Sequence, residues 1–135
     1  MSRHASSGFV ATEFVVGIAL LLVPITLLVA STPTWIERRH AATITAREAA
    51  NLAAETFPAD TGSGAAVGEI IAANYGIDPD DITVRVFDDG TRGGQVRAVV
   101  TIRMPALTIP LIGRVGSWTL ATTHAVRIDD YRSRT

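Results

Sequence analysis

The chain contains no cysteine and no lysine. Without thiols it can form neither a disulfide framework nor a thiolate zinc site, so its redox compartment has to be inferred from other features. Without lysine, all twelve basic residues are arginine, a composition that fits a GC-rich bacterial genome. The absence of cysteine therefore excludes a disulfide-stabilised scaffold and a zinc-thiolate fold.

Net charge is also nearly absent. Twelve arginines and thirteen acidic residues give a formal net charge of -1 at pH 7. A balance this close to zero supplies no basic field for nucleic acid and no acidic surface for a cationic substrate. We therefore expect no nucleic-acid partner and no small-molecule substrate.

Patterns typical of catalysis or of metal binding are scarce as well. A nucleophile needs a base beside it, and a metal needs clustered ligands, but the three histidines are scattered along the chain. The acidic residues near positions 78–89 match no EF-hand spacing, and Asp beside Pro and Gly is ordinary turn chemistry. We therefore expect no enzyme activity, no metal and no cofactor. The residues weighed are His4, His40, His124, Asp78, Asp80, Asp81, Asp88 and Asp89.

The dominant feature is an uncharged apolar run from Phe14 to Ala30, 17 residues long. As a helix it would span about 26 Å, most of the hydrocarbon thickness of a bilayer. Roughly 100 residues remain, which is enough for one small domain. We expect Trp35 to act as an interfacial anchor rather than a core residue. The other expected membrane-anchor residues are Phe14, Leu20, Leu21, Leu22, Leu27 and Leu28.

Glu13 stands at the start of this run. A carboxylate there would cost on the order of 2.5 to 3.5 kcal/mol if it were carried to the bilayer centre. We therefore expect Glu13 to have a specific role. Removal as a secretory signal is the less favoured alternative, because the run exceeds the usual h-region of about 7 to 15 residues. Basic residues flank the run on both sides, so charge alone does not decide its orientation.

The N-terminal motif resembles that of a known family. A short polar leader ends in Gly8, Phe9 follows, Glu13 is the fifth residue after the glycine, and a long apolar run comes next. This arrangement resembles the processing site of type IV prepilins and pseudopilins. The tripeptide Thr12-Glu13-Phe14 is similar to the corresponding sequence of the Tad (tight adherence) branch, in particular of TadE-like minor pseudopilins. The family's basic residue before the glycine is replaced here by serine.

The resemblance implies a maturation pathway and a set of partners. A prepilin peptidase would cleave between Gly8 and Phe9, usually with methylation of the new amino terminus on Phe9. The single-pass protein would stay in the cell membrane, with its C-terminal domain extracytoplasmic, until assembly extracts it into an extracellular pilus or secretion filament that serves secretion or cell adhesion. Glu13 would compensate the terminal amine of a neighbouring subunit. The implied partners are the peptidase, other pilins or pseudopilins, and an inner-membrane assembly platform.

The division of the chain follows from this resemblance: a prepilin-type leader 1–8, a transmembrane helix 9–33 and an extracytoplasmic domain 34–135. The leader has no apolar pattern, so we expect it to be disordered. The competing hypothesis is a signal-anchored envelope binding module that is neither processed nor assembled. It would present residues 104–117 to another envelope protein.

The helical region contains two prolines and a serine–threonine cluster, which are expected to kink or interrupt the helix. Pro24 predicts a kink between Leu20 and Pro24. Residues 31–37 have the form of a helix N-terminus, so either the helix is kinked there or a second helix starts and runs to about residue 57. Small residues follow one face of that stretch, and we expect them to pack on the chain's own β domain rather than on a partner subunit. They are Ala42, Ala46, Ala49, Ala50 and Ala53.

The rest of the chain predicts a short helix and three strands. The helix covers about 65–75, with its larger apolar residues inward: Val67, Ile70, Ile71 and Tyr75. Alternation with period two over 82–87 and 96–103 predicts an antiparallel hairpin around a glycine-rich loop. In it, Val84 and Val100 should be buried and Arg85 and Arg97 exposed.

Residues 104–117 are too rich in proline for a central strand, so we expect a lid over the domain, with a subunit contact as the alternative. A third strand should cover 118–128, with Trp118, Leu120, Val126 and Ile128 on one side, before a frayed polar tail. The expected fold class is α+β: a long, kinked N-terminal helix, a short second helix and a three-stranded antiparallel sheet.

Overall fold

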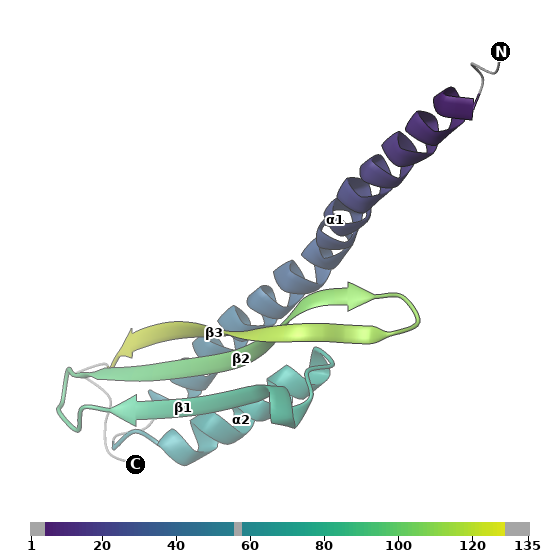
Figure 1. Cartoon of the computed structure of the whole chain (residues 1–135). Coiled ribbons are helices and arrows are strands. Elements are labelled where there is room, and N and C mark those ends of the chain that lie inside the picture. The colour runs from purple at the N-terminus through teal and green to yellow at the C-terminus, as the bar shows by residue number, and fades with distance from the viewer. Residues whose placement is uncertain (1–4, 56–57, 129–135) are drawn as a thin grey trace.

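The computed structural model describes residues 5–55 and 58–128, with side chains from Val10 onward (Figure 1). A long helix α1 (Ala5–Ala53) precedes α2 (Thr61–Asn74), a short 3₁₀ turn η1 (Pro79–Asp81) and three strands. The strands are β1 (Ile82–Asp88), β2 (Gln95–Ile109) and β3 (Gly113–Arg127). The predicted α+β class, with a long first helix, a short second helix and three antiparallel strands, is confirmed. The tail 129–135 lies outside the described residues.

Helix α1 is continuous over 49 residues and contains both Pro24 and Pro33. The alternative of two abutting helices is therefore wrong. The hydroxyl of Ser31 donates to the carbonyl oxygen of Leu27 at 2.8 Å, so this side chain bonds back into the helix instead of capping a new one. A proline removes a single backbone bond, which a long helix tolerates at a cost. The helix begins at Ala5, and residues 1–4 lie outside the described residues, so the expected disorder of the leader stays a prediction.

The sheet has the order β1-β2-β3, and both neighbouring pairs are antiparallel. Val84 pairs with Val100 on the buried face, whereas Arg85 and Arg97 are exposed, as predicted. The alternation continues in β3, where Leu120 and Val126 are half-buried and pack against the core. Trp118 lies on the same side, as predicted, and is 45% exposed.

The segment 104–117 is part of the sheet and does not form a lid. Strand β2 runs through Pro105 to Ile109, and β3 returns from Gly113. The proline is tolerated because the pairing of β1 with β2 ends at Ile102. Beyond that residue β2 has β3 on one side and helix α1 on the other, so Pro105 does not lie between two strands.

The second half of α1 and helix α2 cover the inner face of the sheet (Figure 1). The alanine stripe of α1 is buried under valine and isoleucine side chains of β1 and β2, which confirms packing on the chain's own β domain. Alanines allow the helix to approach the sheet closely because they project little beyond the backbone. The main cluster contains Ala41, Ala42, Ala46, Ala49, Ala50, Ala72, Ile77, Ile82, Val84, Ala98, Val100, Ile102 and Met104.

Helix α2 begins at an N-cap, Asp60, whose carboxylate accepts a bond from the Ser63 amide at 2.9 Å. Its buried residues are Gly64, Gly68 and Ala72. The predicted inward positions of Ile70 and Tyr75 are wrong, because these side chains are 60% and 50% exposed, while Val67 and Ile71 are half-buried. The small residues are selected because a Cβ atom at Gly64 would lie 2.7 Å from the carbonyl oxygen of Ala49.

Candidate functional site

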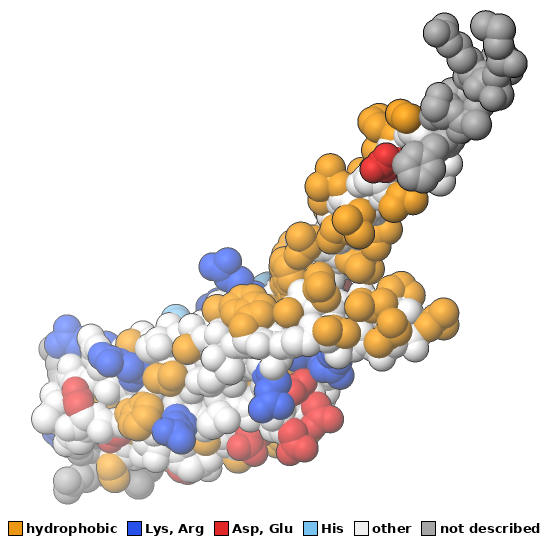
Figure 2. Space-filling model, in the orientation of Figure 1, with side chains coloured by type: hydrophobic (Ala, Val, Ile, Leu, Met, Phe, Trp, Pro, Cys, Tyr) orange, Lys and Arg blue, Asp and Glu red, His pale blue; other side chains and the backbone are white. Residues whose placement is uncertain are grey.

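The first half of α1, residues 10–30, extends beyond the α+β domain and carries apolar side chains on all visible sides (Figure 2). We call it the apolar half. Phe14, Leu20 and Leu21 are 69%, 79% and 64% exposed. Leu22 and Leu28 are also exposed, whereas Leu27 is half-buried. A helix that is apolar all round needs cover from lipid or from other protein. By length and composition α1 can cross a membrane, and a signal sequence has the same properties.

The residues of the cleavage motif lie at the start of this helix. Gly8 and Phe9 are in helical conformation within α1, and the Phe9 side chain lies outside the described part of the chain. Glu13 is exposed within the apolar half. None of the ion pairs among the described residues includes it. The carboxylate therefore stands on an apolar surface and would need a cationic partner if that surface were covered.

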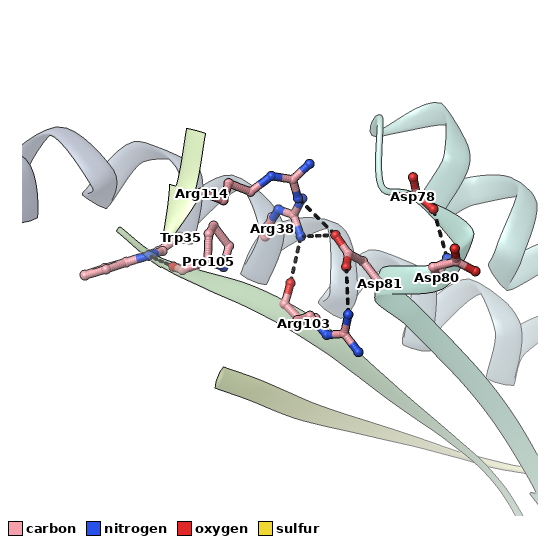
Figure 3. Close-up of polar contacts among 8 residues, drawn as sticks. All are labelled: Trp35, Arg38, Asp78, Asp80, Asp81, Arg103, Pro105 and Arg114. Carbon is pink, nitrogen blue, oxygen red and sulfur yellow. Dashed lines mark hydrogen bonds and ion pairs between the residues drawn. The ribbon is translucent and has the colours of Figure 1, made fainter. Parts of the chain in front are cut away.

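Trp35 lies on α1 five residues after the apolar half and beside Pro105 of β2 (Figure 3). Its ring is half-buried against the main core cluster, and its Nε1 donates to the carbonyl oxygen of Pro105 at 2.7 Å. The sequence predicted an interfacial anchor rather than a core residue at this position. The structure instead packs Trp35 against the core. The indole holds the end of β2 against α1.

Two neighbours on α1 hold the same edge of β2. The Ser31 hydroxyl oxygen accepts a bond from the Thr108 amide at 3.2 Å, and the Arg38 guanidinium donates to the Arg103 carbonyl oxygen at 2.7 Å. Ser31, Trp35 and Arg38 are three to four residues apart, so they share one face of the helix. They satisfy backbone groups that a fourth strand would otherwise pair. We call these three contacts the edge clamp.

The carboxylate of Asp81, the last residue of η1, links that turn to α1, β2 and β3 (Figure 3). Asp81 contacts Arg38 at 3.2 Å, Arg114 at 3.0 Å and Arg103 at 3.8 Å. The side chains of Asp81 and Arg38 are only 14% and 12% exposed. Sequence reasoning missed this cluster, because it had assigned Asp81 to turn chemistry. The arginines come from α1, β2 and β3, so no local spacing could have revealed them.

The other acidic residues behave as turn residues. Asp78 accepts a bond from the Asp80 amide at 3.0 Å, which caps η1. Asp89 accepts bonds from the amides of Gln95 and Thr91, and these donors lower the pKa of its carboxyl below the ordinary value. Among residues 5–55 and 58–128, no group of three His, Cys, Asp or Glu side chains could hold a metal ion.

In this arrangement one helix carries an exposed apolar half and is clamped through its other half to a small sheet. No family model, curated protein or solved structure matches the chain.

Proposed function

We propose that the chain is a TadE-like minor pseudopilin of a Tad-type pilus or a related secretion filament. A prepilin peptidase would process it after Gly8, and it would assemble through the apolar half of α1. Its domain would then be extracytoplasmic, and the protein would pass from the cell membrane into the filament.

One observation carries the proposal. The motif Gly8-Phe9-x-x-x-Glu13 opens a single helix whose first half is exposed and apolar and whose second half is fixed to a domain. The uninterrupted helix couples the two parts mechanically, so a force on the domain is transmitted to the membrane-inserted end. A subunit that has to be extracted from a bilayer needs such a connection.

Glu13 has a defined task in this proposal. After cleavage the amine of Phe9 is cationic and lies beside other apolar helices, where an unpaired buried charge costs several kcal/mol. The exposed carboxylate of Glu13 on a neighbouring subunit is a suitable counter-charge. The cost of carrying Glu13 in the membrane is then offset in the assembled filament.

The direct experiment is intact-mass analysis and N-terminal sequencing of the protein isolated from the membranes of its host. The proposal expects Phe9 as the first residue. Gly8→Leu should leave membrane insertion intact and abolish maturation, because the peptidase has to accept a backbone without a side chain at that position. Met1 or Ser2 at the terminus of the parent protein would favour the signal-anchored binding module instead.

A further inference from the structure

The β2–β3 hairpin ends in an exposed apolar turn. The sequence from Met104 to Gly113 carries no charge. Leu111 is 108% exposed and Ile112 is 74% exposed, and Val115 follows at 43%. We call residues 109–112 the hairpin tip. A small hairpin normally ends in polar turn residues, so this tip has a composition that its fold does not require.

Leu111 also has an unfavourable backbone. Its φ is 71°, and among the described residues it is the only one other than glycine with a positive φ. A turn of this kind favours Gly or Asn, since their side chains tolerate the left-handed region. The chain keeps a leucine that is strained in its backbone and uncovered by its own domain. Such an outlier indicates a contact outside the chain.

The contacts of the edge clamp show which way the tip points. Ser31 contacts Thr108, Trp35 contacts Pro105 and Arg38 contacts Arg103, so β2 runs antiparallel to α1. Beyond Thr108 the strand therefore continues toward the apolar half of the helix. Ile109 extends the strand by about 3.3 Å, and residues 110–112 then form the turn, because Ile109 pairs with Gly113. Figure 2 shows hydrophobic side chains beside the emerging helix, at the same end of the domain.

Polar groups lie just behind the tip. Arg114 of β3 lies two residues after Ile112, is 56% exposed and is held by Asp81. Trp118, at 45% exposed, comes four residues later in the same strand. An apolar end backed by arginine and tryptophan is the arrangement of side chains at a membrane surface, where guanidinium and indole groups lie at the headgroup level.

We infer that the hairpin tip is a second membrane contact, which inserts Leu111 and Ile112 into the headgroup–acyl boundary of the bilayer that holds α1. The inference rests on the membrane placement of α1 in the proposed function. Lipid is favoured over a protein partner because the clamp at Ser31 fixes the tip beside the end of the apolar run. The bilayer is then the nearest apolar phase, whatever else the protein binds.

The chain has no cysteine, so a single introduced thiol can be spin-labelled without ambiguity. Full-length protein would be labelled at Ile112→Cys, at Leu21→Cys in the apolar half, or at Ala125→Cys, an exposed position far along β3. Each variant is reconstituted in phosphatidylcholine vesicles at a high lipid-to-protein ratio, so that copies of the chain do not meet. Power saturation then compares exposure to oxygen with exposure to a water-soluble nickel chelate.

The ratio of oxygen to nickel exposure should be severalfold higher at positions 21 and 112 than at position 125. Adding Leu111→Asn should reduce the ratio at 112 while leaving that at 21 unchanged, and it should not lower the melting temperature in detergent, because Asn suits the positive φ.

If 112 matches 125 while 21 is lipid-exposed, the inference is wrong and the membrane helix stands. If 21 is itself water-exposed, the membrane placement of α1 fails. Shielding of 112 only in host membranes would indicate a protein partner and overturn the lipid contact.

Discussion

The two halves of α1 belong to one helix but have opposite surfaces. In the apolar half, large side chains point outward in every direction, and Phe14, Leu20 and Leu21 are more than half exposed. In the second half, residues 31–53, one face is lined by alanines that are fully buried, and the other face is polar. We call this second half the domain half.

The difference shows how side-chain size selects the partner of a helix. Large apolar side chains on all sides suit hydrocarbon, which adapts to any shape. Alanines on one face suit a rigid neighbour, since they allow the backbones of α1 and α2 to approach until only glycine fits between them. The Gly17 position, in the apolar half, has open space around it, whereas Gly64 contacts Ala49 and Ala53 of the domain half.

The largest expected effect is overpacking of the α1–α2 contact. In Gly64→Ala the new Cβ would lie 2.7 Å from the Ala49 carbonyl oxygen, and a backbone atom cannot easily move away. We expect a loss of about 1 to 3 kcal/mol in the free energy of unfolding. Chemical unfolding in detergent, followed by circular dichroism, measures it.

Two matched variants sharpen this test. Gly62→Ala lies in the same helix and meets only the Asp60 carboxylate at 3.6 Å, so it should stabilise by about 0.5 to 1 kcal/mol. Gly17→Ala, with nothing within 4 Å, should leave the domain unchanged. Equal effects at Gly17 and Gly64 would show that the two halves are not packed differently.

The second-largest expected effect concerns the ion pairs that hold the domain half of α1 to the sheet. Asp81→Asn removes the charge that Arg38, Arg103 and Arg114 share, and it leaves the mostly buried Arg38 without its carboxylate. We expect a loss of about 2 kcal/mol in the free energy of unfolding, the usual range for hydrogen bonds to charged groups. Asp80→Asn, at an exposed neighbouring position, should change stability by less than about 0.5 kcal/mol. Similar losses in both variants would contradict a specific role for Asp81.

The smallest expected effect is on the pH dependence of stability, and it comes from Asp89 in the loop between β1 and β2. Amides of Gln95 and Thr91 donate to the Asp89 carboxylate and lower its pKa. A carboxyl whose pKa is lower in the folded state stabilises the fold above its unfolded value of about 3.9, and this contribution is lost as the pH falls through the folded pKa. The stability difference between the parent protein and Asp89→Asn should therefore be present at neutral pH and shrink below about pH 4. A constant difference down to about pH 2 would show that the charge is not involved.

Regular patterns in the sequence were sufficient to predict most of the fold. Alternation with period two located the hairpin and the burial of Val84 and Val100, and the alanine spacing located the buried face of α1. Proline misled the prediction at two places. Pro33 does not end α1, and Pro105 lies within β2 where β3 is the one neighbouring strand. The tolerance of Pro105 depends on which strands lie beside it, which the sequence does not display.

The features missed in the domain are long-range or depend on small residues. The cluster around Asp81 brings together residues that are up to 76 positions apart in the chain, from Arg38 to Arg114. The buried face of α2 is formed by Gly64, Gly68 and Ala72, which a search for large apolar residues overlooks. Their spacing of four residues, facing an alanine stripe, is the signal that would have revealed this face.

The most direct test of the account compares one glutamate in each half of α1. Glu13 lies in the apolar half and Glu48 on the exposed face of the domain half. Each would be changed to leucine in the host, and insertion, cleavage and co-purification with pilin partners would be measured together. We expect Glu13→Leu to insert and to be cleaved but to fail to co-purify, because the terminal amine of a neighbour loses its counter-charge. Glu48→Leu should behave as the parent protein does. Assembly of Glu13→Leu at the parent level would contradict the role of the apolar half as an assembly helix with a paired charge.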